Sequence, residues 1–137
     1  AVRLQGDGLT MRQTAIVGWA AWTMILLRAA WADGVGLVAA GTQFKKSCGT
    51  CHVAAADGGR RQGPNLFGVV GRQAGEVAEF KYSEAFAKGS GGIVWDEGTL
   101  DRWLADPQSV IPGSVMLYKQ ADPDKRRLVI EYLKTRR

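Results

Sequence analysis

The sequence predicts an all-α fold of one small domain with three to five helices. Apolar residues recur at helical rather than strand spacing in several stretches. Three stretches begin with residues that commonly cap helices: Ser83, Asp96 and Asp122. The 137 residues, 46% of them hydrophobic, suffice for one domain but not for two. The sequence has no internal repeat and no β-strand pattern of note.

Residues 1–32 come first, and they have the pattern of an export signal. A short basic start precedes 13 residues, Ala15 to Leu27, with one polar interruption, and a small-x-small cleavage site ends at Ala32. Spanning a bilayer takes about 20 apolar residues, so this stretch is too short. We expect residues 1–32 to comprise upstream residues and a signal peptide cleaved after Ala32, and residues 33–137 to be the mature domain. An uncleaved membrane anchor stays open because Arg28 lies close to the cleavage site.

The charge of the mature domain is modest. The 18 Lys and Arg lose Arg3, Arg12 and Arg28 with the leader, and the 13 Asp and Glu lose Asp7, which leaves a net charge of +3. Because the positive residues are dispersed along the chain, we expect no nucleic acid among the partners.

An amphipathic helix is predicted from about Gly36 to Cys48, because apolar residues recur there at helical spacing. It leads into Cys48-Gly49-Thr50-Cys51-His52. Cys-x-x-Cys-His is the attachment signature of a c-type haem. Two thiols three residues apart can each add to a vinyl group at one edge of the porphyrin. The adjoining histidine then offers a ring nitrogen to the iron.

Three other chemistries use closely spaced cysteines. A structural zinc site needs four ligands, but Cys48, Cys51 and His52 are the only cysteines and histidine in the chain. A thioredoxin-like redox pair needs a strand–helix–strand context, which the flanking sequence lacks. A disulfide across so short a loop would restrain almost nothing. The pattern favours covalent haem, with a colourless thiol–disulfide oxidoreductase as an alternative.

The segment after the motif is predicted to be a loop, because residues 54–63 are rich in Gly, Ala and Arg. A turn beginning with Gly63-Pro64 follows. A metal-bound histidine usually donates its second N–H to a carbonyl or carboxylate. The carbonyl of Pro64 is a candidate acceptor for His52, although a plain turn explains the same residues.

Two short helices are predicted next. The first has Ser83 as its N-cap and Gly89 as its C-cap. The second begins after Asp96 as N-cap and must end before Pro107. The apolar face of the second helix consists of Leu100, Trp103 and Leu104.

The last helix has the clearest start signal, with Asp122 as N-cap and Pro123 in the first helical position. Its predicted buried stripe consists of Val129, Tyr132 and Leu133. The first and last helices each have one narrow apolar face, so we expect them to pack on each other.

Met116 is a candidate second ligand. Met11 and Met24 would leave with the signal peptide, so Met116 is the only methionine of the mature domain. A lone methionine is usually core filler, but this one follows a Pro112-Gly113 turn in a predicted loop, which suits a side chain held towards an iron. Haem carriers commonly pair His with Met.

The chain resembles the class I c-type cytochromes, close to the mitochondrial type and its α-proteobacterial relatives. The resemblance covers about residues 36–133. It rests on Phe44–His52, Gly63–Gly68, Gly71–Arg72, Phe80–Ser83, Ile93–Trp95, Ile111–Met116 and Tyr132–Lys134. Their order and spacing agree with the family apart from a short insertion at residues 89–92.

The resemblance implies the small cytochrome c fold, with three to five helices wrapped around one covalently bound haem c. Cys48 and Cys51 would carry the thioethers. His52 and Met116 would be the axial ligands of the iron, and Pro64 would accept the hydrogen bond from His52.

Further site residues are implied by position within the family. Arg72, Tyr82 and Trp95 stand where the family has its partners for the haem propionates. Such partners are needed because a buried carboxylate requires donors or a positive charge nearby. Trp103 replaces a tyrosine near the methionine, and Phe86 replaces a polar residue of an internal water network. A drier pocket disfavours the charged ferric state and raises the potential, whereas loss of a hydrogen bond to the methionine sulfur shifts it either way.

The implied function is a periplasmic one-electron carrier rather than an enzyme. Its donor would be a cytochrome bc1-type quinol–cytochrome c reductase or a periplasmic dehydrogenase, and its acceptor a terminal cytochrome oxidase. We expect a monomer that meets the membrane only through partners, unless the leader is retained. Val115 replaces a lysine, which thins the basic docking surface. A haem-based peroxidase or gas sensor is the alternative if Met116 does not hold the iron.

Overall fold

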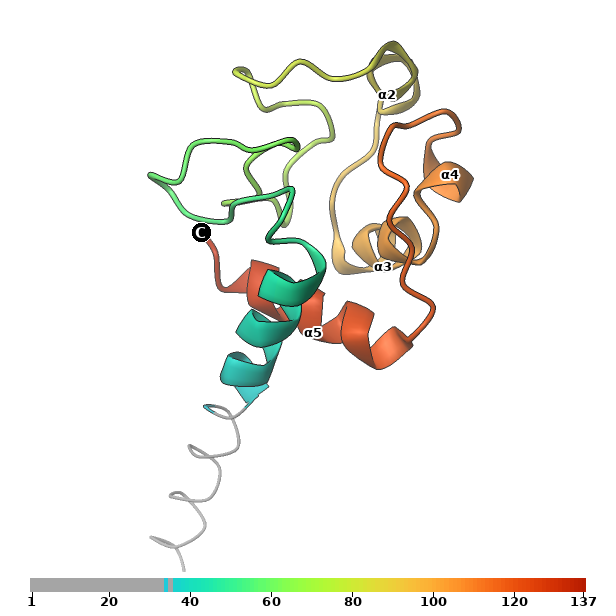
Figure 1. Ribbon diagram of the computed structural model, residues 1–137. Helices are drawn as coiled ribbons and strands as arrows, with labels where there is room; N and C mark the ends of the chain where they lie inside the picture. The colour runs from blue at the N-terminus through green and yellow to red at the C-terminus, as the bar shows by residue number, and fades with distance from the viewer. Residues whose placement is uncertain (1–33, 35) are drawn as a thin grey trace, which may run out of the picture. The chain divides into compact units, whose positions relative to one another are not determined.

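A computed structural model describes residue 34 and residues 36–137, and the predicted leader lies outside them (Figure 1). Five helices are present in this part: the N-terminal helix over residues 36–47, α2 over Glu84–Gly89, α3 over Glu97–Ala105, α4 over Pro107–Val110 and α5 over Pro123–Lys134. The only β-pairing among the described residues is an isolated antiparallel bridge between Gln73 and Val94. No helix within them is long and apolar enough to cross a membrane. The described part of the chain is therefore all-α, as the sequence predicts.

The N-terminal helix packs across α5, which confirms the predicted pairing of the first and last helices. Figure 1 shows the two helices crossing below the loops of the domain. Phe44 and Tyr132 stack at the crossing, with their ring centroids 4.5 Å apart. Ala40 and Phe44 are buried there. The crossing fixes the direction in which the N-terminal helix delivers Cys48 to the interior.

α3 packs against α5 and supplies the opposite side of the core. Asp96 is its N-cap and accepts a hydrogen bond of 2.6 Å from the backbone N of Thr99. An ion pair of 2.7 Å between Arg126 Nε and Asp101 Oδ1 links the two helices. The predicted apolar face is buried: Leu100, Trp103 and Leu104.

The buried face of α5 is broader than predicted. Val129 and Leu133 are buried as expected, but Ile130 is also buried, and Tyr132 is only half-buried. α5 contacts the N-terminal helix on one side and α3 on another, so more than one narrow stripe is covered. Tyr132 lies at the edge of this surface, stacked on Phe44.

α4 follows α3 directly and was not predicted. α3 ends at Ala105, before Pro107, as expected. Asp106 then caps α4 by accepting a hydrogen bond of 3.0 Å from the backbone N of Gln108, and Pro107 takes the first helical position. A helix of four residues is too short to show hydrophobic periodicity, so only its Asp-Pro start signals it.

α2 begins where predicted but ends one residue later. Ser83 accepts a hydrogen bond of 3.3 Å from the backbone N of Phe86. The C-cap is Ser90, so the prediction of Gly89 as C-cap is wrong. A Cβ at Gly89 would lie 2.7 Å from Cγ2 of Ile111. The glycine is therefore needed for close approach to Ile111 rather than for a left-handed turn.

Candidate functional site

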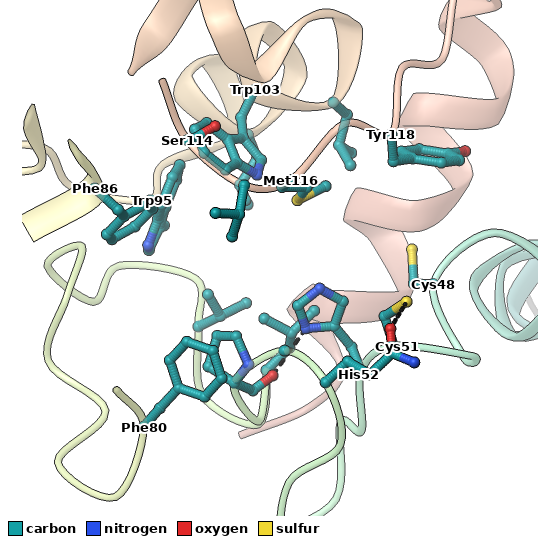
Figure 2. A pocket seen from close by; sticks show the side chains of 18 of the residues that line it. Cys48, Cys51, His52, Phe80, Phe86, Trp95, Trp103, Ser114, Met116 and Tyr118 are labelled. Atoms are coloured by element: carbon teal, nitrogen blue, oxygen red, sulfur yellow. Dashed lines mark hydrogen bonds between the residues drawn. The ribbon is translucent and has the colours of Figure 1, made fainter. Parts of the chain in front are cut away.

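A cavity of about 460 Å³ opens between the turn after the N-terminal helix, α3 and the segment after α4. Its volume lies in the range of cofactor pockets, roughly 300–1,000 Å³. Figure 2 shows side chains from both sides pointing into it. All nine residues predicted for the site line this cavity: Cys48, Cys51, His52, Pro64, Arg72, Tyr82, Trp95, Trp103 and Met116.

The N-terminal helix brings two thiols to one edge of the cavity. Its last turn continues through hydrogen bonds from the backbone N atoms of Cys51 (3.0 Å) and His52 (2.8 Å) to the carbonyl of Cys48. This turn puts the Cys48 and Cys51 side chains next to each other, with the His52 ring beside them (Figure 2). Cys48 is buried and Cys51 is half-buried, and neither forms a disulfide.

The imidazole of His52 is held in one orientation and one tautomer. Its Nδ1 lies 2.8 Å from the carbonyl oxygen of Pro64. A carbonyl can only accept, so Nδ1 carries the proton and Nε2 keeps a free lone pair. Burial lowers the pKa of His52 and therefore favours the neutral ring. The hydrogen bond to Pro64 offsets part of this lowering. A neutral imidazole is the form that ligates metals.

Gly63 is a site residue that the sequence analysis did not assign. A Cβ at this position would lie 2.6 Å from Nδ1 and 2.8 Å from Nε2 of His52, closer than real Cβ contacts. Only glycine therefore lets the chain pass behind the imidazole and present the Pro64 carbonyl. The one feature of the sequence that could have identified Gly63 as a site residue is its position directly before Pro64.

Met116 lies on the other side of the cavity from His52, as Figure 2 shows. From Ser114 to Tyr118 the burial of successive side chains alternates between the interior and the surface. Ser114 is buried and Met116 is half-buried. In contrast, Val115 and Leu117 are 78% and 77% exposed. The alternation turns the thioether of Met116 inward at the mouth of the cavity.

Polar groups gather at another part of the cavity wall. The Arg72 guanidinium donates to the carbonyls of Phe67 (3.0 Å) and Asn65 (3.1 Å), which fixes its direction. Backbone hydrogen bonds around the isolated bridge hold Arg72 beside Trp95, since Trp95 N donates to the Arg72 carbonyl at 2.9 Å. Burial raises the pKa of Tyr82, and the nearby Arg72 offsets part of this effect.

An aromatic cluster of Phe86, Trp95 and Trp103 fills the methionine side of the cavity. The ring centroids of Trp95 and Trp103 are 5.3 Å apart, and those of Phe86 and Trp103 are 5.8 Å apart, both edge-to-face. Tyr82 stacks on Phe86 at 4.8 Å. These rings give the cavity a continuous apolar surface on this side.

The described residues disfavour the other chemistries of closely spaced cysteines. Within residues 36–137 no three His, Cys, Asp or Glu side chains come together as a metal site. Burial, with a smaller contribution from Cys51, raises the pKa of Cys48 to about 12. Redox-active cysteines have lowered pKa values, so Cys48 is a poor attacking thiol.

The donor set fits a covalently attached haem. Two thiols lie at one edge, a neutral imidazole and a thioether lie on opposite walls, and the surfaces between them are largely aromatic or aliphatic. Gly63 leaves just enough room behind the imidazole. Together with the helical fold, this site defines a c-type cytochrome.

Comparisons with known proteins agree. The chain is 47% identical over 89 residues to cytochrome c2 iso-2 of Magnetospirillum molischianum, a match that covers 64% of this chain and 89% of that protein. It is 38% identical over 109 residues to cytochrome c-550 of Novispirillum itersonii, covering 73% and 98%. Among solved structures, cytochrome cH from Methylobacterium extorquens matches with a TM-score of 0.63 and 37% identity, over 72% of this chain and 96% of that one. No protein-family model matches the chain.

The chain belongs to the class I c-type cytochromes. It carries one haem c, attached covalently through Cys48 and Cys51. It is an electron carrier that works with other redox proteins.

Proposed function

We propose that this chain is a periplasmic one-electron carrier in which His52 and Met116 are the two axial ligands of the haem iron. The haem, when bound, supplies the redox step between Fe(III) and Fe(II). The observation that carries the proposal is that these two side chains line opposite walls of one cavity, beside the paired cysteines. With both axial positions filled by protein, the iron site is closed to small molecules and little rearranges on electron transfer.

The protein around the two ligands keeps them in place and keeps water out. The carbonyl of Pro64 holds the His52 ring through Nδ1, which leaves Nε2 available for the iron. The cluster of Phe86, Trp95 and Trp103 covers the methionine side with apolar surface. A dry, apolar environment penalises the charged ferric state, so the reduction potential should be raised.

Arg72, Tyr82 and Trp95 are the proposed partners of the haem propionates. All three line the cavity, and Arg72 lies close enough to Tyr82 to lower its pKa against the effect of burial. Arg72 uses two of its five N–H groups on main-chain carbonyls. Its remaining donors and positive charge suit a carboxylate.

The proposed donor is a cytochrome bc1-type quinol–cytochrome c reductase or a periplasmic dehydrogenase, and the proposed acceptor is a terminal oxidase. The cavity reaches the surface beside Val115 and Leu117. We propose that partners dock over this mouth and that the protein acts as a monomer.

We also propose that the protein is exported through a signal peptide in residues 1–32, which is cleaved after Ala32. The test of this proposal is the N-terminal sequence of the protein recovered from a periplasmic fraction.

Carbon monoxide separates the carrier from the alternative peroxidase or gas sensor. The reduced wild-type protein should bind CO slowly, because Met116 occupies the second axial position. Met116→Ala should bind CO rapidly, whereas Val115→Ala, a change at the exposed neighbour, should behave as wild type. Rapid CO binding by the wild-type protein would contradict the proposed carrier function and support a haem enzyme or gas sensor instead.

A further inference from the structure

The side chain of Gln108 is fastened to the loop that carries Met116. Its Oε1 accepts a hydrogen bond of 2.9 Å from the backbone N of Gly113. Its Nε2 donates to the carbonyl (2.8 Å) and to the hydroxyl oxygen (3.1 Å) of Ser114. One amide thus makes three hydrogen bonds to two consecutive loop residues, and both of its N–H groups and its oxygen are used. No role for Gln108 was expected from the sequence.

We propose that Gln108 is a positioning residue that holds Met116 in place for the iron by clamping the start of its loop. The proposal rests on Met116 being the axial ligand. Gln108 does not itself line the cavity, so it acts through Ser114, which lies two residues before Met116 and lines the cavity with it.

The base of the clamp is rigid. Gln108 lies in α4, where the carboxylate of Asp106 holds its backbone N at 3.0 Å. Its neighbour Pro107 and the C-cap Ile111 are among the most deeply buried side chains of the described residues, and Ile111 is 0% exposed. A side chain anchored on such an element transmits its position to whatever it binds.

The target of the clamp is buried. Ser114 is 4% exposed, so its hydroxyl and carbonyl cannot turn to water if Gln108 is lost. Leaving buried polar groups without partners costs more than the net value of the bonds. The loop would therefore have to move outward to satisfy them, and Met116 would move with it.

The far end of the loop is held independently. Gln120 N donates to the Leu104 carbonyl at 2.8 Å, and Lys119 pairs with Asp106 at 2.7 Å on an exposed surface. An exposed ion pair contributes little. At the near end, the backbone offers only a bond of 3.2 Å from Ser114 N to the Ile111 carbonyl. Gln108 is thus the main polar restraint at the start of the loop.

The test compares holoprotein variants by two signals of the iron–methionine bond: the far-red charge-transfer band of the oxidised protein and the CO-binding rate of the reduced protein. In Gln108→Ala the band should weaken, and CO should bind about tenfold faster, since one or two net hydrogen bonds correspond to about that factor. Gln108→Glu keeps an acceptor for Gly113 N but puts a carboxylate oxygen against the Ser114 carbonyl, which can only accept. Its band should weaken and its CO rate should rise at least as much as in Gln108→Ala. Ser109→Ala removes an exposed hydroxyl from the same helix, with its bond to the Asp106 carbonyl, and should match wild type.

Each outcome decides between two claims. A wild-type protein without the far-red band would defeat the proposal that Met116 is a ligand. A normal wild-type band, with band and CO rate unchanged in Gln108→Ala, would overturn the role of Gln108 alone. If Gln108→Ala does not fold, Gln108→Glu and Ser114→Ala each remove part of the clamp. Faster CO binding in them supports the proposal, and an unchanged rate overturns it.

Discussion

At the scale of single residues, His52 depends on two neighbours that have no redox chemistry. The Pro64 carbonyl sets its tautomer from 2.8 Å, and Gly63 leaves the space in which its ring lies. Residue type and spacing made Cys48, Cys51 and His52 predictable. Gly63 was not predictable in the same way, because a close approach between two side-chain positions exists only in the folded chain.

Gly63→Ala should disturb the imidazole. The added Cβ would lie within 2.8 Å of both ring nitrogens, and relieving such overpacking typically costs about 1–3 kcal/mol. We expect a smaller fraction of the chain to mature with covalent haem and a lower melting temperature for the fraction that does. Haem stain per protein and thermal unfolding followed in the Soret region measure both.

Gly91→Ala is the matched control for this substitution. A Cβ at Gly91 has no neighbour within 4 Å, and its backbone needs no positive φ. Both quantities should therefore stay at wild-type values. If Gly63→Ala matures and melts as Gly91→Ala does, the close packing of Gly63 against His52 is not important.

At the scale of elements, helix starts were easier to predict than helix ends or short helices. Ser83, Asp96 and Asp122 cap their helices through side-chain oxygens, as their residue types indicate. α4 escaped prediction because four residues carry no periodicity. The Gly89 prediction failed because a glycine near a helix end serves either a left-handed turn or a close contact, and the sequence does not distinguish the two.

Two glycine-to-alanine substitutions in helices should change the stability of the protein in opposite directions. Gly89→Ala gains helix propensity of up to about 1 kcal/mol, but its Cβ would meet the fully buried Ile111 at 2.7 Å. Overpacking of about 1–3 kcal/mol outweighs the gain, so we expect a net loss of about 1 kcal/mol and a melting temperature lower by about 4–8 °C.

Gly98→Ala in α3 is the counterpart. Its Cβ would lie 3.6 Å from its nearest neighbours, an ordinary contact, so the propensity gain should remain and stability should rise by up to about 1 kcal/mol. Thermal and denaturant unfolding of the holoprotein measure the pair. A stabilising Gly89→Ala would mean that Ile111 can move and that the α2–Ile111 contact is looser than described.

At the scale of the whole molecule, some exposed lysines of the described residues are in ion pairs and others are not. On the methionine side, Val115 and Leu117 are apolar and exposed, and Lys119 is neutralised by Asp106. Lys45 and Lys46, shortly before Cys48 in the sequence, are exposed and form no ion pair with any described residue. The net charge of +3 for residues 33–137 therefore says little about docking, because its effect depends on which basic residues face the partner.

Val115→Lys should strengthen electrostatic docking at the methionine side. We expect the association rate with an oxidase that has an acidic docking surface to rise several-fold at low salt. The gain should shrink towards physiological ionic strength, where the Debye length falls to about 8 Å. Val115→Gln removes the apolar side chain without adding charge and is the control. Stopped-flow oxidation across a salt series measures both, and equal rates for the two variants would contradict a role for charge at this position.

The fold class could be predicted best from the sequence, and the contacts between helices and loops could be predicted least. An all-α domain with Cys-x-x-Cys-His directly after its first helix and a loop methionine before its last helix follows from periodicity and residue type. The set of residues that α5 buries could not be predicted in this way. Ile130 is buried and Tyr132 is only half-buried because two neighbouring helices pack against α5, and this packing exists only in the folded chain. The clamp of Gln108 on Ser114 is likewise a contact between two loop-adjacent segments that no local pattern encodes.

We propose that His52 and Met116 hold the iron of the haem attached to Cys48 and Cys51. The most direct measurement is the absorption spectrum of the oxidised and reduced protein, purified from a host that matures c-type haem. Sharp c-type bands in the reduced state and a far-red methionine-to-iron band in the oxidised state are the predicted result. Covalent haem without the far-red band would contradict the ligation by Met116, and a protein without haem would contradict the assignment of Cys48, Cys51 and His52 as a haem-attachment site.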